Sequence, residues 1–258
     1  MSKRAIYAVY GESKYLSEAT RSARSLREHC PNCEIVAYAA RGCIPDLDTD
    51  AFDQVVAVDL SIRGSLKLDF AIKLEAIKRG LTDYTLFIDT DTLVCNNLDD
   101  AWELLNRFDV LACHAPYRRR LRYENFEEPT FVSEVPSAFC ELNTGVIFLR
   151  DNNRTRSFIE AWYDLYEREP SSGDQYLFMD TLYKSDCSLY VLPPEFNYRM
   201  TIPGFACDPI RIVHAHHPDL EGAAMRLNAS TVPRVSMLRR GELELWAPAS
   251  TAPQPPQK

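Results

Sequence analysis

The sequence has no long hydrophobic run. Of its 258 residues, 46% are hydrophobic, yet no stretch approaches the ~20 consecutive apolar residues that a membrane-spanning helix needs. The opening MSKRAIYAVY holds an apolar run too short for a signal peptide, with no small-residue cleavage site after it. We therefore expect a globular protein that is not integral to a membrane and that resides in the cytoplasm.

Positive charge is also scarce. Lysine and arginine total 29 against 37 aspartates and glutamates, which gives a formal net charge of −8. A chain that binds nucleic acid through its overall charge is strongly basic. We therefore expect no nucleic-acid partner.

Paired cysteines at metal-ligand spacing are missing as well. The eight cysteines are scattered over a chain too long to need disulfides for its stability. Cys30 and Cys33 form one CPNC, without a second Cys pair or Cys/His pair at zinc-site spacing. We interpret CPNC as a helix-to-strand turn that contains two cysteines. The alternatives are a redox centre and half of a zinc site.

Short apolar runs alternate with segments of helical periodicity, which predicts an α/β fold with a mainly parallel sheet flanked by helices. Strands are predicted at Ala5–Tyr10, Glu34–Tyr38, Gln54–Val58, Thr85–Ile88, Val110–Cys113, Val146–Leu149, Leu189–Leu192 and Arg211–Val213. Helices are predicted at Ser17–His29, Leu66–Gly80, Asp99–Phe108, where Asp99 is expected to cap the helix, Ser157–Glu167 and Gln175–Tyr183.

Two segments lack periodicity. Residues 115–141 are expected to form a long surface loop suited to binding residues. This loop carries Tyr117, Arg118, Arg119, Arg120, Arg122 and Tyr123. Residues 247–258, APASTAPQPPQK, form a proline-rich tail that is expected to be disordered. The remainder, residues 1–246, is expected to form a single domain.

The strongest local signal is a pair of carboxylates after an apolar strand, Asp89 and Asp91 in LFIDTDTLV. Ligands of open α/β folds bind outside the carboxyl ends of strands, and alternate residues of an extended chain project to one side. Clustered carboxylates repel one another, and a hard divalent cation relieves that repulsion. An ordinary capped turn is the structural alternative.

The same DxDxT pattern resembles the nucleophile motif of haloacid-dehalogenase-type phosphatases, in which Asp89 would be phosphorylated. In that family the motif usually stands near the start of the domain, with a glycine after the second aspartate. Here Thr92 occupies that place and three predicted strands precede it. The phosphatase is therefore the rival hypothesis and not the leading one.

Further motifs follow in order: LNTGVIFLR at 142–150, GDQYLF at 173–178, LPPEFNYR at 192–199 and RIVHAHHP at 211–218. With FIDTDTLV, this succession resembles the glycogenin-like and galactosyltransferase-like retaining glycosyltransferases of the GT-A fold, over roughly residues 4–218. Their motifs run DADT, FNSGV, DQ, LPFxYN and VVHF. The resemblance implies a Rossmann-like GT-A fold, a nucleotide-sugar donor and a divalent metal.

Residue by residue, the resemblance implies that Asp89, Asp91 and His214 bind Mn²⁺ or Mg²⁺. Such an ion acts as a Lewis acid that neutralises a diphosphate leaving group. Thr90, between the two aspartates, is expected to contact the nucleotide sugar. A hydrogen-bonded histidine at a strand end is the structural alternative for His214.

The resemblance also implies residues around the transferred sugar. Asn143 and Thr144 are expected to lie along the sugar, although turn chemistry would also explain the Asn-Thr-Gly sequence. Asp174 is expected to bind sugar hydroxyls, and Gln175 to lie near the far face of the reacting carbon. A helix N-terminus is the alternative for this pair.

Two residues near the N-terminus also match the family. Tyr15 is expected to stack on the nucleotide base, and Lys73 to supply positive charge beside the phosphates or sugar. The chain departs from the family after His214, where a Lys-Pro-Trp that closes over the pyrophosphate is missing. His217 or Arg226 is expected to replace it.

The sequence therefore predicts a retaining transferase that moves a sugar from a nucleotide diphosphate, expected to be a UDP-sugar, to a hydroxyl of a glycan, protein or small molecule. The resemblance implies front-face attack, with Asp174 or Gln175 as a transient nucleophile as the alternative. A catalytically silent GT-A protein that binds a glycan or nucleotide is the alternative from another functional class.

Overall fold

The computed structural model describes residues 1–59, 68–115, 133–136, 138–169, 173–229 and 233–246. Most of the predicted arginine-rich loop, including its tyrosines and arginines at positions 117–123, lies outside the described residues. The predicted proline-rich tail lies outside them entirely.

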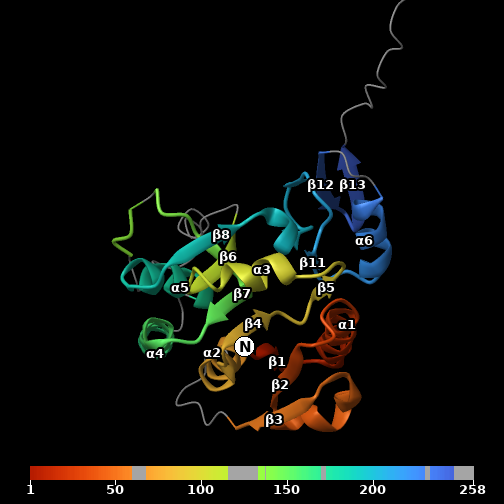
Figure 1. The fold of residues 1–258 in the computed structure, drawn as a ribbon. Coiled ribbons are helices and arrows are strands. Elements are labelled where there is room, and N and C mark those ends of the chain that lie inside the picture. The colour runs from red at the N-terminus through yellow and green to blue at the C-terminus, as the bar shows by residue number, and fades with distance from the viewer. Residues whose placement is uncertain (60–67, 116–132, 137, 170–172, 230–232, 247–258) are drawn as a thin grey trace, which may run out of the picture.

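The centre of the protein is a seven-stranded sheet in the order β3-β2-β1-β4-β7-β6-β8 (Figure 1). Only β7 runs antiparallel to its neighbours β4 and β6; the other pairings are parallel. The strands are β1 (Lys3–Val9), β2 (Glu34–Ala40), β3 (Gln54–Val58), β4 (Tyr84–Ile88), β6 (Val110–His114), β7 (Leu142–Arg150) and β8 (Leu189–Leu192). The predicted α/β class with a mainly parallel sheet is confirmed.

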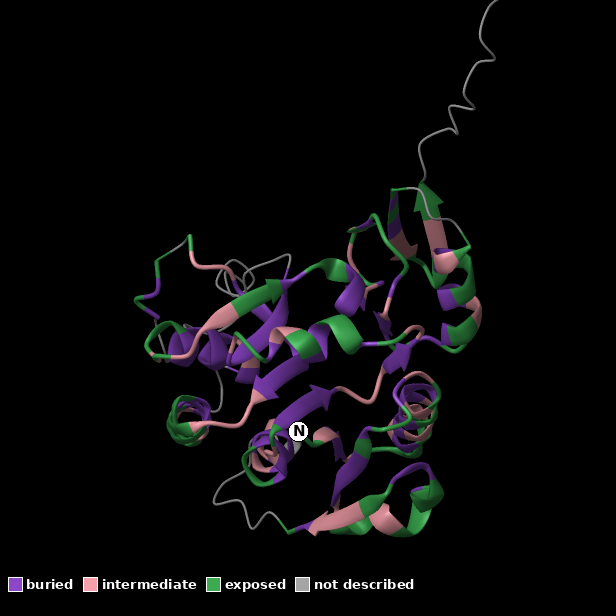
Figure 2. Ribbon diagram, in the orientation of Figure 1, coloured by how far each residue is buried: buried purple, intermediate pink, exposed green. Residues whose placement is uncertain are grey.

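Helices cover both faces of this sheet because its strands are apolar on both sides, as parallel strands usually are. Alternate strand residues such as Tyr7 and Leu86 pack with α1 (Ser13–His29) and α3 (Asp99–Leu104). The other face packs against three helices, α2 (Leu68–Gly80), α4 (Asn153–Arg168) and α5 (Asp174–Tyr183). The resulting layers appear in Figure 2 as buried strands between helices with one exposed side.

Two three-stranded sheets accompany the central sheet, and the chain enters the first of them directly after β4. The first has the order β5-β11-β9 and consists of β5 (Thr92–Val94), β11 (Ile212–His214) and β9 (Tyr198–Arg199). The second consists of β10 (Gly204–Ala206), β12 (Arg234–Arg239) and β13 (Glu242–Trp246), beside α6 (Leu220–Asn228). Short 3-10 helices, η1 (Arg41–Asp46), η2 (Thr49–Ala51) and η6 (Pro194–Phe196), complete the described elements.

Several predicted boundaries were wrong. Helix α1 begins at Ser13, four residues before the predicted start, so that Tyr15 lies within it. Strand β7 begins at Leu142 and contains the Asn-Thr-Gly sequence, so the turn interpretation of that sequence is wrong. Asp99 lies in the first turn of α3 while Leu98 occupies the cap position, and the helix ends at Leu104, before the predicted Phe108.

The CPNC sequence forms the predicted turn between α1 and β2. The Cys33 amide donates to the Cys30 carbonyl at 3.0 Å, and both side chains are buried. Burial raises the pKa of Cys33 to about 12, which favours the protonated, less reactive thiol at neutral pH. All eight cysteines are unpaired.

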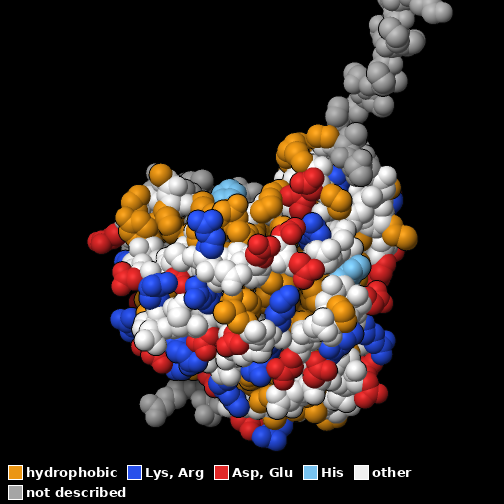
Figure 3. Space-filling view, viewed as in Figure 1, with side chains coloured by type: hydrophobic (Ala, Val, Ile, Leu, Met, Phe, Trp, Pro, Cys, Tyr) orange, Lys and Arg blue, Asp and Glu red, His pale blue; other side chains and the backbone are white. Residues whose placement is uncertain are grey.

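The face of the protein drawn in Figure 3 carries charged side chains of both signs. On the face drawn in Figure 3, acidic and basic side chains are interspersed and not separated by sign. Among the described residues, no helix combines the length and the apolar character needed to cross a membrane.

Candidate functional site

The chain leaves β4 through a turn that several backbone contacts fix. The Asp89 amide donates to the Gly145 carbonyl at 2.7 Å, which ties the first residue after β4 to β7. The Thr92 hydroxyl donates to the Asp89 carbonyl at 2.8 Å, and the Ala215 amide donates to the Asp91 carbonyl at 2.9 Å. The turn is therefore held by two sheets at once.

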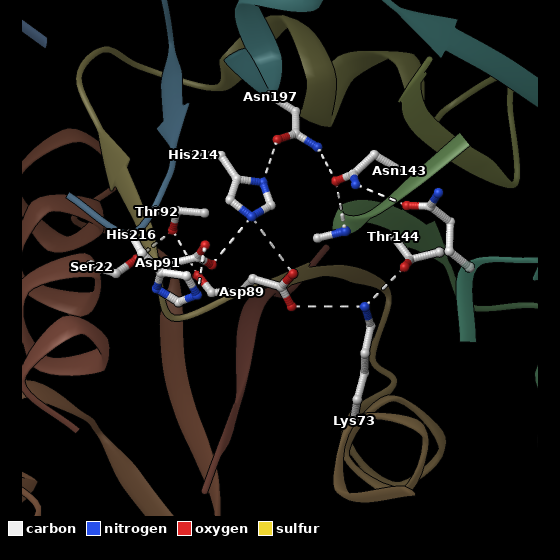
Figure 4. Close-up of polar contacts among 12 residues, drawn as sticks. Ser22, Lys73, Asp89, Asp91, Thr92, Asn143, Thr144, Asn197, His214 and His216 are labelled. Carbon is white, nitrogen blue, oxygen red and sulfur yellow. Dashed lines mark hydrogen bonds and ion pairs between the residues drawn. The ribbon is translucent and has the colours of Figure 1, made fainter. Parts of the chain in front are cut away.

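This turn brings Asp89 and Asp91 together with His214, the last residue of β11. The Nε2 atom of His214 lies 3.2 Å from Oδ1 of Asp91 and 3.8 Å from Oδ2 of Asp89 (Figure 4). One potential ligand atom of each of the three residues lies within 4.8 Å of those of the other two. Among the described residues, the three therefore form a candidate metal site. Two carboxylates and an imidazole at this separation fit a divalent cation.

The backbone of β7 makes room for the cluster at Gly145. A Cβ atom there would overlap Cε1 of His214 and would lie 2.5 Å from Oδ2 of Asp89. A glycine is therefore required at this position for the three ligands to approach one another.

The two aspartates differ in their electrostatic surroundings. Burial raises the pKa of Asp89, and this effect outweighs the opposing charges of Lys73 and His214. Burial also acts to raise the pKa of Asp91, but His214, through its charge and a hydrogen bond, together with His216, holds that pKa well below its usual range. A cation between them would favour the ionised form of both.

A buried ion pair forms the wall next to the cluster. Nζ of Lys73, on α2, lies 2.8 Å from Oδ2 of Asp174 at the start of α5 and 3.8 Å from Oδ1 of Asp89. Lys73 also donates to the Thr144 hydroxyl at 3.0 Å, and that hydroxyl donates to Asp174 at 2.7 Å. Trp162 anchors the same helix end, because its Nε1 donates to the Asp174 carbonyl at 3.0 Å.

Amide side chains continue this wall behind His214. His214 Nδ1 lies 2.8 Å from Oδ1 of Asn197, and Nδ2 of Asn197 donates to Oδ1 of Asn143 at 2.7 Å. Asn143 then donates to Gln175 at 2.9 Å, and Gln175 donates to the buried Glu141. The predicted residues Asn143 and Gln175 are thus joined to the metal-ligand cluster.

A cavity of about 290 Å³ opens in front of the cluster. Its lining includes Tyr15, Lys73, Asp89, Thr90, Asp91, His214 and His216. A larger cavity of about 570 Å³ runs along α1 and includes none of the three ligands. The smaller cavity is therefore the candidate site, because it combines concave shape with the clustered ionisable groups.

His216 lies between α1 and the cluster. Its Nδ1 lies 3.0 Å from Oε2 of Glu18, its Nε2 lies 3.6 Å from Oδ2 of Asp91, and its ring meets that of Tyr15 edge-on with centroids 5.4 Å apart. His216 therefore faces the cavity between the expected base and metal positions.

The structure does not bring His217 to the cavity. Its Nδ1 accepts the Asp219 amide at 3.1 Å, and its Nε2 faces the Gly241 carbonyl at 3.4 Å, so the ring packs beside α6. Arg226 lies on the exposed side of that helix. Of the two histidines that follow His214 closely, His216 lines the cavity and His217 does not.

Three residues of the site were missed by the sequence analysis: Glu18, Glu141 and Asn197. Asn197 lies inside the quoted LPPEFNYR motif, and Glu141 directly precedes LNTGVIFLR. Glu18 lies one helical turn after Tyr15, so a helix beginning at Ser13 would have placed both on one face.

Comparisons with known proteins identify the family of this chain. Residues 78–219, more than half of the chain, match the profile of the nucleotide-diphospho-sugar transferase family. Glucoside xylosyltransferase 1 of Rattus norvegicus is 28% identical over 146 residues, 49% of this chain and 32% of that protein. Glucoside xylosyltransferase 2 of Mus musculus is 31% identical over 137 residues, 45% of this chain and 30% of that protein. The chain matches about a third of the length of these curated relatives.

Solved structures show the same fold. The galactosyltransferase LgtC, in complex with donor and acceptor sugar analogs, superposes with a TM-score of 0.57 at 14% identity over 88% of this chain and 94% of that chain. Mouse xyloside xylosyltransferase 1 gives a TM-score of 0.56 at 12% identity over 84% of this chain and 98% of that chain. The profile match shows that the chain belongs to the nucleotide-diphospho-sugar transferase family, and the sheet and its structural neighbours show the GT-A glycosyltransferase fold.

Proposed function

We propose that the protein transfers a sugar from a UDP-sugar to an acceptor hydroxyl, with Mn²⁺ or Mg²⁺ as cofactor and with retention of the anomeric configuration. The observation that carries this proposal is the convergence of Asp89, Asp91 and His214 beside a cavity with Tyr15 in its lining. Family membership supports a nucleotide-sugar donor. The family relatives named above support a glycoside or glycan as acceptor.

The ligand set fits the proposed cation. Asp89 and Asp91 supply hard oxygen ligands, His214 supplies an imidazole nitrogen, and Gly145 leaves the space that they need. When bound, the cation neutralises the charge that develops on the departing diphosphate. Mn²⁺ and Mg²⁺ are both compatible with carboxylate-rich sites, and the imidazole favours Mn²⁺ of the two.

The rest of the cavity suits the nucleotide. Tyr15 offers an aromatic ring for the uracil base, at little cost in conformational entropy. Thr90 lines the cavity between the two aspartates, and His216 faces it from the side of α1. These residues would hold the base and the diphosphate on either side of the carboxylate pair.

The contacts of Asp174 and Gln175 support front-face transfer. Asp174 is buried and is held by Lys73 and Thr144, while the Gln175 amide is bonded on both sides. Neither group is presented as a nucleophile, so we propose that both position the sugar. The bond from the anomeric carbon to the phosphate oxygen breaks, the acceptor oxygen bonds to the same face of that carbon, and its proton passes to the departing phosphate.

Two alternative functions predict results that differ from those of a transferase. A phosphatase of the haloacid-dehalogenase type would use Asp89 as the nucleophile and would release phosphate from sugar phosphates. A silent binding protein would bind nucleotide or glycan without turnover. The family match and the complete ligand set favour transfer over both.

A screen of nucleotide sugars with Mn²⁺ tests the proposal. We expect one UDP-sugar to raise the melting temperature and to be hydrolysed slowly without an acceptor. NMR of the product formed with a glycoside acceptor should show the anomeric configuration of the donor. An inverted product would contradict front-face transfer, and phosphate release from sugar phosphates would favour the phosphatase.

A further inference from the structure

Five side chains form an unbroken hydrogen-bonded chain behind the ligand cluster. It runs from His214 through Asn197 and Asn143 to Gln175 and Glu141. All but Gln175 are buried. Figure 4 shows the portion from His214 to Asn143 on the side of the imidazole that faces away from the aspartates.

The direction of these hydrogen bonds can be derived. The oxygen and nitrogen of an amide side chain resemble one another in shape, so their assignment must come from their partners. The backbone N–H of Gly145 lies 3.0 Å from one amide atom of Asn143. A backbone N–H only donates, so that atom is Oδ1 and the other amide atom, which faces Gln175, is Nδ2.

The far end of the chain gives the same direction independently. Asn143 Nδ2 donates to Oε1 of Gln175, which leaves Nε2 of Gln175 facing Glu141. A carboxylate accepts, so this contact is satisfied only in that orientation. The orientation of Asn143 is therefore fixed at one end by a backbone donor and at the other by an acidic acceptor.

The same argument fixes the position of a proton on the His214 ring. The Asn197 atom that faces Oδ1 of Asn143 at 2.7 Å must be the donor Nδ2, so its Oδ1 faces the imidazole at 2.8 Å. An oxygen acceptor at that distance requires a proton on Nδ1 of His214. The Nε2 atom faces Asp89 and Asp91, where a bound cation would take the place of the proton that Nε2 shares with Asp91 in the metal-free protein.

We propose that Asn143 and Asn197 are positioning residues, which hold the proton on Nδ1 of His214 and thereby present Nε2 as the metal ligand. The metal-binding purpose rests on the proposed function, whereas the direction of the hydrogen bonds does not. Without an acceptor at Nδ1, the imidazole is free to carry its proton on Nε2, where it cannot bind a metal. This role is separate from the sugar contact expected of Asn143, which stays a prediction.

Two substitutions of Asn197 distinguish the loss of the hydrogen-bond acceptor for His214 from a change in side-chain packing. Asn197→Leu removes the acceptor for Nδ1, whereas Asn197→Asp keeps an oxygen acceptor there, replaces the donor toward Asn143 by an oxygen and adds a carboxylate charge. Asn228→Leu is the control, because the hydrogen bonds of Asn228 lie away from the cluster: two are with the Ile210 backbone and one is with Arg234. Each variant is compared with wild type by its denaturation midpoint and by Mn²⁺ titration, followed by the electron paramagnetic resonance of free Mn²⁺ in the absence of nucleotide.

We expect Asn197→Leu to weaken Mn²⁺ binding at least about tenfold, the usual effect of losing the partner of a metal-ligating histidine. Asn197→Asp should stay within about threefold of wild type, because it keeps the acceptor. Asn228→Leu should lower the midpoint and leave Mn²⁺ binding unchanged. Unweakened binding in Asn197→Leu, or equal weakening in both Asn197 variants, would overturn the proposal.

A spectrum of the metal-free protein tests the proposal without any transferase assay. With histidine labelled by ¹⁵N, the Nδ1 atom of His214 should carry a proton that exchanges slowly with solvent, and Asn197→Leu should remove that protection. A proton on Nε2 with a bare Nδ1 would overturn the assignment. If wild type failed to bind Mn²⁺ the proposed function would fail, and this spectrum would still decide the role of Asn197.

Discussion

Gly145 lies so close to His214 that a Cβ atom at position 145 would overlap the imidazole ring. Gly145→Ala should therefore displace His214 and Asp89, lower Mn²⁺ affinity at least about tenfold and destabilise the fold by about 1–3 kcal/mol, as overpacking does. Calorimetry with Mn²⁺ and urea denaturation measure the two effects. Gly42→Ala is the control, since no atom lies within 4 Å of its added Cβ, and unchanged Mn²⁺ affinity in Gly145→Ala would contradict the crowding.

The two aspartates should have opposite effects on the stability of the metal-free protein. Because burial raises the pKa of Asp89, its ionised form is disfavoured in the folded state, and this destabilisation grows as pH rises through the raised pKa. Asp89→Asn should therefore raise the melting temperature at neutral pH. The ionised form of Asp91, whose pKa is lowered in the folded state, stabilises the fold above the pKa that Asp91 has in the unfolded state, and this contribution is lost as pH falls. Asp91→Asn should therefore lower the melting temperature at neutral pH.

Both substitutions should nevertheless abolish Mn²⁺-dependent turnover, because each removes a charged ligand. Differential scanning calorimetry without metal and a donor-hydrolysis assay with Mn²⁺ provide the two readouts. Shifts of the same sign in melting temperature would refute the electrostatic difference between the aspartates. Full turnover in either variant would refute its role as a ligand.

Lys73 and Asp174 form a pair in which both side chains are about 95% buried. Lys73→Met removes one partner of a buried pair, which typically costs about 3–5 kcal/mol, and it should also abolish donor turnover. Lys73→Met combined with Asp174→Leu should recover part of the stability and none of the turnover. Urea denaturation of the single and double variants measures the difference.

Lys184 offers a matched control for that experiment. Its Nζ lies 2.8 Å from the buried Asp180, but its side chain is 54% exposed and lies outside the cavity. Lys184→Met should cost about 1 kcal/mol or less and leave turnover unchanged. Equal losses of stability in Lys73→Met and Lys184→Met would show that burial does not increase the contribution of the Lys73–Asp174 ion pair to stability.

The adjacent histidines should differ in function. His216 faces the cavity, so His216→Ala should raise the donor KM about fivefold, the effect of one hydrogen bond of about 1 kcal/mol, and leave Mn²⁺ affinity unchanged. His217 accepts the Asp219 amide at the start of α6, so His217→Ala should lower the melting temperature without changing the donor KM. Steady-state kinetics over donor concentration decide between them, and the reverse pattern would place the diphosphate beside His217.

Local sequence signals predicted the elements that local chemistry determines. The runs Gln54–Val58 and Leu189–Leu192 are β3 and β8 with the predicted bounds, since each is a short run rich in valine, leucine or tyrosine with Asp, Ser or Pro on its flanks. The position of Asp89 and Asp91 followed from the apolar run before them. In each case the signal and its structural consequence lie within about ten residues.

The remaining features depend on distant partners. Asn143 and Gly145 are poor strand formers, but the pairs on either side of them, His114 with Leu142 and Ile88 with Val146, keep this part of β7 extended. Asn197 contacts residues 54 positions before it and 17 after it, which no local pattern reveals. Helix α1 begins without a side-chain cap at Glu12, so the usual sequence signal of a helix start was absent.

The release of UDP from a UDP-sugar, measured in Mn²⁺ and again after chelation, tests the proposed metal-dependent transfer most directly. Wild-type protein should release UDP only with the divalent cation, should release it faster when an acceptor glycoside is added, and should lose the activity in Asp91→Asn. Equal release in the presence of chelator, or undiminished release by Asp91→Asn, would contradict the assignment of Asp89, Asp91 and His214 as the catalytic metal site.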